Sequence, residues 1–244
     1  MAIPPGAPDP RQVRGMFDRI APVYDLMNTV MTAGTDARWR RSTIASLGLQ
    51  PGGQVLDVAT GTGKLALAAA ERVAPGGAVI GLDASSKMLA RARRAADRRD
   101  RGASLAALEW VMGDALHLPF GDGAFDAVTI GFGLRNLTDY EAGLREMARV
   151  LRPGGRLAVL EISEPRSGVG RMLFVTWFRR IIPALGRLIG RRAAYSYLPA
   201  SLERYPEPER VAELMRSAGF TTIRWRRLPT GFATLHVGER EADA

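Results

Sequence analysis

The fold of this chain is decided by the stretch QVLDVA at residues 54–59, which runs directly into TGTG at residues 60–63. The first six residues form a short apolar run typical of a buried strand, and the two glycines predict a tight turn after it. An Ala- and Leu-rich segment over 65–73 then predicts a helix, and the apolar run AVIGLD over 78–83 predicts a second strand. A strand–helix–strand unit of about 30 residues favours two parallel strands with a right-handed crossover.

The alternation of helices and strands continues towards the C-terminus. The expected elements are a helix over 85–98, strands over 108–112 and 125–130, a helix over 139–151, a strand over 156–160, a helix over 207–217, and strands over 221–227 and 232–238. The last two strands are joined by a short link and therefore predict an antiparallel hairpin. The chain is thus expected to be an α/β protein with a doubly wound, mostly parallel, seven-stranded Rossmann-like sheet that ends in an antiparallel strand.

The segments outside this core are predicted to be helical parts of one domain that spans residues 11–244. Residues 11–47 show helical spacing of apolar side chains with two breaks, so we interpret them as two or three helices that form a lid. Residues 166–200 are expected to form a helical insertion after the strand over 156–160. The Pro-rich residues 1–10 are expected to be a flexible tail.

Composition restricts the class of protein. Hydrophobic residues make up 46% and charged residues 24% of the chain, as in globular proteins, and the absence of Cys excludes disulfides, thiolate metal sites and a cysteine nucleophile. No apolar run reaches the ~18 residues of a membrane span and the N-terminus has no signal-peptide pattern, so a cytoplasmic protein is expected. No bound metal is expected either. Residues 1–165 carry 20 basic and 18 acidic side chains, whereas residues 166–244 carry 14 and 7. The C-terminal third is therefore expected to face something anionic.

Two features after the first strand point to an adenosine cofactor. Glycines at a strand-to-helix turn let a ligand approach the main chain, and Asp83 at the end of the second strand is placed to accept hydrogen bonds from ribose hydroxyls. The third glycine of a dinucleotide-binding turn is missing, because Leu65 and Ala66 follow Lys64. Asp57 would repel a pyrophosphate but would suit the ammonium group of a methionine moiety. An NAD(P)-binding Rossmann protein remains the alternative.

Four short motifs follow one another along this predicted core. They are D-x-A-T-G-T-G over 57–63, the acid at 83, the turn GDA over 113–115, and RVLRPGGRL over 149–157. Together they resemble the class I S-adenosylmethionine (SAM)-dependent methyltransferases, and the resemblance implies SAM as the cofactor. The residues that it places around the cofactor are Asp57, Thr60, Gly61, Thr62, Gly63, Asp83, Asp114, Ala115 and Gly131.

Three further motifs are FDRIAPVYDLMN over 17–28, GFGLRN over 131–136 and YSYLP over 195–199. With the core motifs, they resemble the ubiquinone/menaquinone biosynthesis C-methyltransferases. The resemblance implies methyl transfer from SAM to a ring carbon of a reduced polyprenyl quinone precursor, with demethylmenaquinol, converted to menaquinol, as the favoured substrate. Benzoquinol methylation in ubiquinone biosynthesis and a small-molecule O- or N-methyltransferase remain alternatives. This family often has Ser where this chain has Gly131, so a hydroxyl contact near the cofactor is expected to be missing.

Two other functions are disfavoured. Methylation of nucleic acid at a pyrimidine carbon generally uses a cysteine nucleophile, which the chain lacks. Methylation of exocyclic amines resembles an Asp/Asn-Pro-Pro-aromatic motif, where this chain has GFGLRN, so no nucleic-acid partner is expected. A binding module without chemistry is opposed by the intact acids and glycines of the cofactor motifs.

The expected chemistry assigns roles to three residues. A ring carbon beside a hydroxyl becomes nucleophilic when that hydroxyl loses its proton, so the site must stabilise a phenolate. Arg135 lies just past a strand end, and as a permanent cation it can stabilise the phenolate or orient a water but cannot be the base. The alternative for Arg135 is a salt bridge to a nearby acid such as Asp139. Asn136 is expected to hold the hydroxyl and Tyr24 to order the ring, with packing on the sheet as the alternative for Tyr24.

The insertion and the two histidines complete the expectations. The arginine-rich residues 166–198 contain no acid, and their apolar side chains, including Trp177 and Ile181, recur at helical spacing. This pattern predicts either a peripheral contact with an anionic surface on the inner face of the cell membrane or a flap over the active site. His117 is expected to face solvent, and His236 to be either packed or catalytic. The sequence is also compatible with a homodimer.

Overall fold

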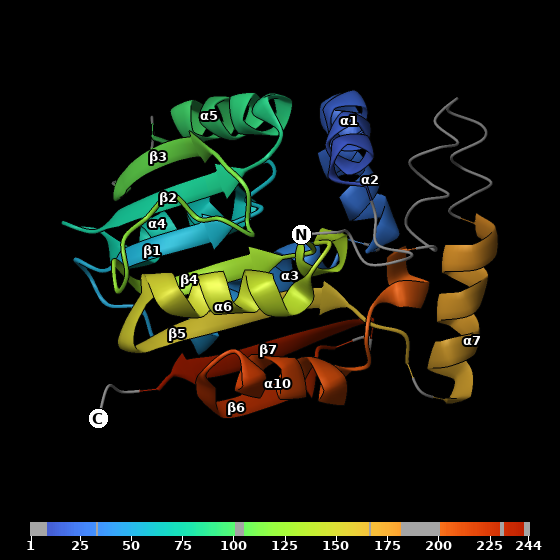
Figure 1. Cartoon of the computed structure of the whole chain (residues 1–244). Helices are drawn as coiled ribbons and strands as arrows, with labels where there is room; N and C mark the ends of the chain where they lie inside the picture. The colour runs from blue at the N-terminus through green and yellow to red at the C-terminus, as the bar shows by residue number, and fades with distance from the viewer. Residues whose placement is uncertain are drawn as a thin grey trace.

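The computed structural model describes residues 9–32, 34–100, 105–165, 167–181, 201–229 and 232–241. Its centre is a seven-stranded sheet with the order β3-β2-β1-β4-β5-β7-β6 (Figure 1). The strands are β1 (Gln54–Val58), β2 (Ala78–Asp83), β3 (Ala107–Met112), β4 (Phe125–Gly131), β5 (Leu151–Ile162), β6 (Phe220–Arg227) and β7 (Ala233–Arg240). Strands β1 to β5 pair in parallel, and β7 is antiparallel to both β5 and β6. The predicted doubly wound sheet and C-terminal hairpin are confirmed.

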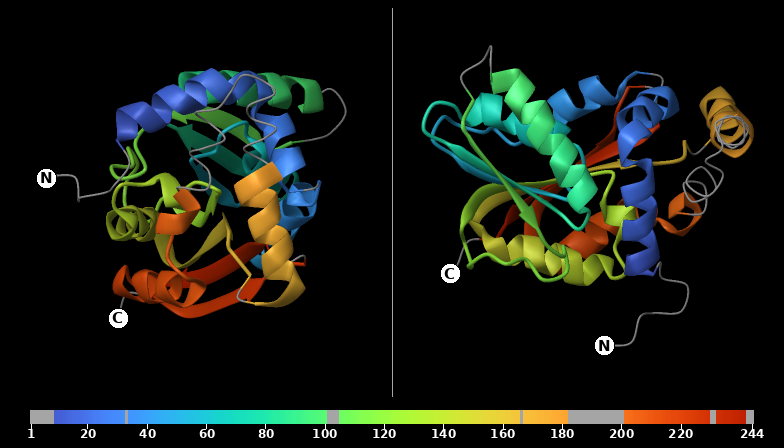
Figure 2. Two further views of the ribbon diagram at one scale, coloured as in Figure 1. Left: turned by 90° about the vertical axis from the view of Figure 1, so that its right-hand side faces the viewer. Right: turned by 90° about the horizontal axis from the view of Figure 1, so that it is seen from above.

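Helices cover both faces of the sheet. They are α1 (Pro10–Ile20), η1 (Ala21–Val23), α2 (Tyr24–Met31), α3 (Asp36–Ser46), α4 (Lys64–Val73), α5 (Ser86–Asp100), η2 (Leu134–Asn136), α6 (Tyr140–Val150), α7 (Gly168–Thr176), η3 (Trp177–Ile181) and α10 (Pro208–Ser217). Helices α3 and α4 lie on one face, with α5 beside them over β2 and β3, and α6 and α10 lie on the other face (Figure 2).

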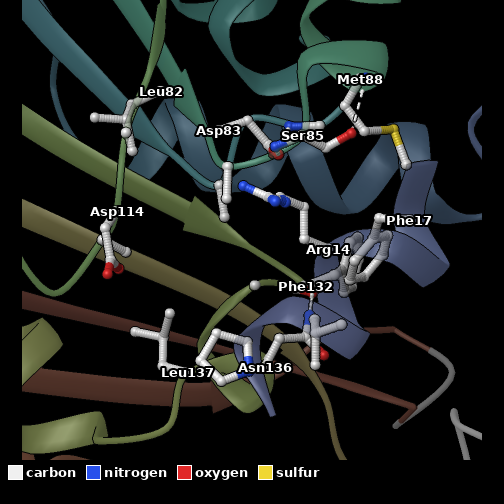
Figure 3. A pocket seen from close by; sticks show the side chains of 18 of the residues that line it. Arg14, Phe17, Leu82, Asp83, Ser85, Met88, Asp114, Phe132, Asn136 and Leu137 are labelled. Atoms are coloured by element: carbon white, nitrogen blue, oxygen red, sulfur yellow. Dashed lines mark hydrogen bonds between the residues drawn. The ribbon is translucent and has the colours of Figure 1, made fainter. Parts of the chain in front are cut away.

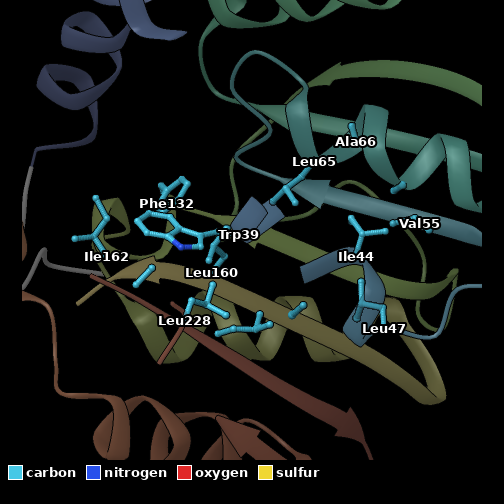
Figure 4. Close-up of a cluster of buried hydrophobic side chains, with 14 of the residues drawn as sticks. Trp39, Ile44, Leu47, Val55, Leu65, Ala66, Phe132, Leu160, Ile162 and Leu228 are labelled. Carbon is cyan, nitrogen blue, oxygen red and sulfur yellow. The ribbon is translucent and has the colours of Figure 1, made fainter. Parts of the chain in front are cut away.

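Each face of the sheet has its own apolar core. Trp39, Ile44 and Leu65 bring α3 and α4 onto the sheet in the first core (Figure 4). Leu144 of α6 and Met215 of α10 belong to the second core. Because both faces of the central strands are covered, these strands read as continuous apolar runs, and this is the pattern that predicted them.

All three N-terminal helices contribute to the first core. Helix α3 packs within it, and α1 and α2 add Met16, Ile20, Met27 and Met31. Helices α1 and α2 also stand at the edge of the sheet to which the arrowheads of β1 and β2 point (Figure 1). The carboxylate of Asp18 on α1 accepts a hydrogen bond from Ser85 Oγ at 2.6 Å. The carboxylate of Asp25 on α2 accepts one from Thr62 Oγ1 at 2.8 Å. These two contacts hold α1 and α2 over the turns that follow β1 and β2.

Strand β5 begins earlier than predicted. It starts at Leu151, which pairs with Phe125, and not at the expected residue 156. The register with β4 shifts between Phe125 and Ala127, and this irregularity lets β5 accommodate Pro153 and Gly154. The sequence predicted a turn there because Pro and Gly usually interrupt strands.

The segment after β5 is described in part. Helix α7 continues directly into the π-helical turn η3, which ends at Ile181. Residues 182–200, with the YSYLP motif of the sequence, lie outside the described residues, as do residues 1–8. Across the described ranges, no helix is both long and apolar enough to cross a membrane.

Candidate cofactor and substrate site

A pocket opens at the carboxyl ends of β1, β2, β3 and β4, beneath α1 and α2 (Figure 3). It is partly open to solvent and is lined by apolar side chains with a small number of polar groups, as is typical of a small-molecule site. Doubly wound sheets bind ligands at this edge, where the strand order reverses. The predicted site residues that line it are Tyr24, Gly61, Asp83, Asp114, Ala115, Gly131 and Asn136. The predicted residues that do not are Asp57, Thr60, Thr62, Gly63 and Arg135.

Asp83, at the end of β2, has a carboxylate held by the main chain. The Gly61 N–H donates to its Oδ2 and the Ser85 N–H donates to its Oδ1, both at 2.8 Å. Burial raises the pKa of Asp83 to about 6; the two main-chain donors oppose the rise, and the negative charges of Asp57 and Asp18 add to it. Each carboxylate oxygen keeps a lone pair for a further donor, so Asp83 can accept two ribose hydroxyls.

Asp57, near the end of β1, fixes the glycine turn through hydrogen bonds to its carboxylate. Its Oδ2 accepts from Thr60 Oγ1 at 2.6 Å and from the Ala66 N–H at 3.1 Å, and its Oδ1 accepts from Thr129 Oγ1 at 2.6 Å. Burial raises the pKa of Asp57, against these donors and the charge of Arg40. The expected contact of Asp57 with an ammonium group does not match this placement, because its carboxylate is buried and fixes the shape of the turn instead.

The two glycines of the turn have different roles. Gly61, with a φ of 58°, lines the pocket and exposes its main chain to a ligand. Gly63, with a φ of 80°, faces β3, where an added Cβ would lie 2.7 Å from Trp110 Cη2 and 3.0 Å from Ala92 Cβ. Gly63 is therefore required by the backbone conformation and by packing, and not by ligand access. The hydroxyl of Thr62 is directed away from the pocket, to α2.

The wall opposite α1 is formed by the turn that follows β3. Asp114, Ala115 and Leu116 line it, and Met88 of α5 lines the adjoining side. Asp114 Oδ1 accepts the Leu116 N–H at 3.0 Å, which orients the carboxylate. Apolar side chains beside a fixed carboxylate suit the flat ring and amino edge of an adenine. The side chain of His117 is 86% exposed and faces solvent, as predicted.

Strand β4 ends at Gly131, and the chain then turns at Phe132. Phe132 has a φ of 58°, a strained value for an aromatic residue. Its N–H donates to the β5 main chain at 2.8 Å, and its ring is flanked by Trp39 and by the guanidinium of Arg40, 5.1 Å from the ring centroid. The carbonyl of Phe132 accepts from Asn136 Nδ2 at 3.2 Å. The strained turn thus orients the Asn136 amide beside the pocket.

The side chain of Leu65 packs closely against Gly131, where a larger residue would need space. An added Cβ would lie 2.5 Å from Leu65 Cδ1 of α4. The room that a serine would need at this position is therefore occupied by Leu65, and the chain has packing there in place of a hydroxyl.

Arg135 is turned away from the pocket into a buried ion pair. Its Nη1 bonds Oε1 of Glu161 at the end of β5, and its main-chain N–H donates to Oε2 of the same carboxylate at 3.3 Å. Burial raises the pKa of Glu161, and the charge of Arg135 opposes this rise. The phenolate-facing placement expected of Arg135 is therefore not found. Its acidic partner is Glu161 and not Asp139, whose carboxylate caps α6 by accepting the Ala142 N–H at 2.9 Å.

Several lining residues were not singled out as site residues from the sequence. Arg14 and Phe17 project from α1 into the pocket, and Phe132 lines it from the end of β4 (Figure 3). Phe17 packs edge-on against Tyr24, with ring centroids 6.0 Å apart. The helical spacing of apolar residues in α1 was visible in the sequence, but the direction of Arg14 depends on how α1 docks on the sheet.

His236 is packed in the second half of the sheet. Its Nε2 lies 2.9 Å from the Pro208 carbonyl oxygen and its ring stacks on Trp225. Burial lowers the pKa of His236, which favours the neutral ring. Of the two roles left open for it, the structure shows the packed one.

The fold and the site together define a class I SAM-dependent methyltransferase, and the residues present fit that cofactor. The acid at the end of β2, the main chain at Gly61 and the turn after β3 all face one pocket. A dinucleotide-binding alternative is not supported. The chain belongs to the ubiE/COQ5 methyltransferase family, which matches residues 7–240.

Relatives with established names cover nearly the whole chain. The demethylmenaquinone methyltransferase of Thermus thermophilus is 49% identical over 226 residues, which are 92% of this chain and 100% of that protein. The ubiquinone/menaquinone biosynthesis C-methyltransferase UbiE of Geobacter sulfurreducens is 40% identical over 229 residues, 94% of this chain and 88% of that protein.

Solved structures agree on the fold. The cyclase SpnF superposes with a TM-score of 0.70 over 97% of this chain and 98% of its own, at 21% sequence identity. A SAM-dependent methyltransferase from Aquifex aeolicus superposes with a TM-score of 0.60 over 82% of this chain and 88% of its own, at 18% identity. At these identities the likeness concerns the fold alone.

Proposed function

We propose that this chain transfers the methyl group of SAM to a ring carbon of a reduced polyprenyl quinone precursor, with demethylmenaquinol as the first candidate. The observation that carries the proposal is full-length similarity, at 49% identity, to a protein named demethylmenaquinone methyltransferase. The pocket supports it, because aromatic side chains of Phe17, Tyr24 and Phe132 line the space beside the cofactor residues and suit a flat aromatic substrate.

The cofactor side of the pocket has assigned roles in this proposal. Asp83 accepts the two ribose hydroxyls, Asp114 and Ala115 meet the adenine, and the main chain of Gly61 and Gly131 borders the methionine portion. Asp57, Thr60, Thr62 and Gly63 act indirectly by holding the turn in shape. Bound SAM supplies an electrophilic methyl group on a sulfonium.

The substrate side of the pocket is formed by residues of α2 and of the η2 turn. Asn136 meets the ring hydroxyl with its amide, whose orientation is held by the hydrogen bond that Nδ2 donates to the Phe132 carbonyl. Tyr24 orders the ring from α2. Arg135, paired with Glu161, holds the η2 turn that carries Asn136 and so positions it.

The ring hydroxyl loses its proton to solvent water, and the charge of the phenolate is shared with the adjacent ring carbon. With SAM bound, that carbon would take the methyl group, and the electron pair of the broken sulfur–methyl bond would stay on sulfur. The ring carbon then releases its own hydrogen as a proton and the ring becomes aromatic again. A quinone cannot enter this sequence, because it has no hydroxyl proton to lose.

The proposal is tested by methyl transfer from labelled SAM to reduced demethylmenaquinone and to a demethylated benzoquinol, with product mass and methyl position recorded. We expect ring methylation of the naphthoquinol and no product from the oxidised quinone without a reductant. Methylation of the benzoquinol alone would assign the ubiquinone pathway. Methyl groups found only on oxygen or nitrogen would contradict C-methylation.

We further propose that the chain contacts anionic membranes through apolar residues of α2 and α7. Leu26 of α2 is 66% exposed, and Met172 and Leu173 of α7 are 62% and 55% exposed. The η3 turn, which continues α7, is linked to α2, because Trp177 Nε1 donates to the Met31 carbonyl oxygen at 3.1 Å. Trp177 is partly buried and packs against the first core, so we assign the apolar contact to the more exposed Met172 and Leu173 of α7. A prenylated substrate resides in a bilayer, so a soluble pocket needs such a contact.

This contact is tested by sedimentation with anionic vesicles at low and high salt. Met172→Glu is expected to weaken vesicle binding, whereas Met112→Glu, at a methionine that is 65% exposed at the end of β3, is the matched control and is expected to leave it unchanged. High salt should weaken binding of the wild type, since each well-placed arginine contributes roughly 1 kcal/mol through a screened attraction. Equal binding by both variants would contradict the assignment of this surface.

A further inference from the structure

The charges that line the pocket are unevenly distributed. Asp83 and Asp114 contribute two carboxylates, and Arg14 contributes the one cationic side chain among the described lining residues. In Figure 3 the Arg14 side chain reaches from α1 into the space between Asp83 and Phe132. A reaction that passes through a phenolate needs a positive charge in this space, and within the described part of the chain Arg14 is the lining residue that supplies one.

The fold holds Arg14 in this direction. Helix α1 begins at Pro10, with Asp9 as its cap accepting the Arg11 N–H at 2.8 Å. Arg14 and Asp18 are four residues apart and therefore share a face of α1. Asp18 accepts a hydrogen bond from Ser85 Oγ at 2.6 Å, which fixes that face against the start of α5. The contact that holds α1 over the pocket therefore also directs the Arg14 guanidinium into it.

Arg135, the cation expected from the sequence to stabilise the phenolate, is paired with another residue. Arg135 is buried, its Nη1 is paired with Glu161, and it does not line the pocket. Moving it to the substrate would leave the Glu161 carboxylate buried without that cation, at a substantial cost in free energy. Arg14 is exposed and pays no such cost.

We propose that Arg14 stabilises the phenolate form of the substrate during methyl transfer. This inference rests on the proposed function, which requires a phenolate. The guanidinium of Arg14 is a permanent cation and donates N–H groups to the ring oxygen. The ring proton goes to solvent water, so Arg14 is neither acid nor base. Its carrier, α1, couples closure of the pocket to activation of the ring.

The test compares Arg14→Gln and Arg14→Lys with Arg11→Gln. Arg11 lies on the same helix and does not line the pocket, so its substitution removes the same charge without touching the site. At saturating SAM and reduced demethylmenaquinone, Arg14→Gln is expected to lower kcat by about 10- to 100-fold, less than the ~10²–10³-fold loss on removing one enclosed oxyanion donor, since Arg14 is exposed. Arg14→Lys should be intermediate, and Arg11→Gln should match the wild type.

Two further measurements separate this role from a structural one. The loss in Arg14→Gln should shrink as pH rises from 6 to 9, because solvent then ionises the ring without help, whereas SAM affinity by calorimetry should change less than about twofold. Bound 1-naphthol, read by the absorbance of its ionised form in the presence of S-adenosylhomocysteine, should show a lower pKa in the wild type than in Arg14→Gln. This second measurement needs no turnover.

The outcomes are distinct. A pH-independent loss in Arg14→Gln, or an unchanged naphthol pKa, would overturn the proposal. Weakened SAM binding with unchanged kcat would also overturn it and would assign Arg14 to the carboxylate of the cofactor. A wild type that methylates no ring substrate would instead contradict the proposed function, and the phenolate role would fail with it.

Discussion

We expect Asp83 to make SAM binding pH-dependent near neutral pH. Its carboxyl has a pKa of about 6 because it is buried, and the ionised form is needed to accept two ribose hydroxyls. With that pKa, about nine tenths of the carboxyl groups are ionised at pH 7 and about one tenth at pH 5. We therefore expect the Kd for SAM to rise about tenfold between pH 7 and pH 5.

The assay is calorimetric titration of SAM at pH 5, 6 and 7. Asp83→Asn should bind SAM more weakly at pH 7, by ~1 to 3 kcal/mol for the lost charged acceptor, and its affinity should no longer depend on pH over this range. Asp97→Asn removes an exposed carboxylate of α5 and should keep the wild-type dependence. A constant Kd in the wild type, or an unchanged dependence in Asp83→Asn, would refute the reasoning.

The same group affects the stability of the cofactor-free protein with a sign opposite to that of an ordinary acid. The pKa of Asp83 rises from 3.8 to about 6 on folding, so the folded state binds its proton more tightly than the unfolded state does. Its contribution to stability is therefore present in full below pH 3.8 and is lost as pH rises through 6, by up to ~3 kcal/mol. We expect bound ribose hydroxyls to offset this loss, which would link cofactor binding to stability at neutral pH.

Two substitutions test the framework around the pocket by urea unfolding. Gly63→Ala should lower the free energy of unfolding by about 2 to 4 kcal/mol, because the new Cβ meets Trp110 and the backbone has a positive φ. Gly52→Ala is the control and should cost only about 1 kcal/mol, because Gly52 also has a positive φ but faces open space. Similar losses at both positions would rule out the contact with Trp110. Glu161→Gln removes the carboxylate that neutralises buried Arg135 and should cost about 3 to 5 kcal/mol, and a loss below 1 kcal/mol would show that this pair is not needed for stability.

The local turns of the cofactor site were predictable because their residues are neighbours in sequence. Gly61 follows β1 directly, and Asp83 ends β2, so the strand–helix–strand pattern alone places both at one edge of the sheet. The start of β5 was not predictable, because the bulge that admits Pro153 depends on the register with β4. That register is set by pairing between strands and leaves no mark in the sequence of either.

The pairing of charges across the fold was predicted least well. Arg135 meets Glu161, which is 26 residues away in sequence, and Asp57 accepts a hydrogen bond from Thr129 of β4, which is 72 residues away. Sequence spacing favoured Asp139 for Arg135 because it lies nearby on the chain. Burial decides otherwise, since a buried cation must meet an acid within the same interior region, whatever their separation in sequence.

The sequence by itself determined the mostly parallel sheet and the class of cofactor, because apolar periodicity and glycine turns act over a few residues. Only the tertiary structure decided which of the predicted site residues face the pocket. The hydroxyl of Ser85 holds α1 over the strand ends, and this contact turns Arg14 inward while Glu161 draws Arg135 away. Side-chain direction follows from contacts between distant segments, and those contacts exist only once the helices and sheet have packed together.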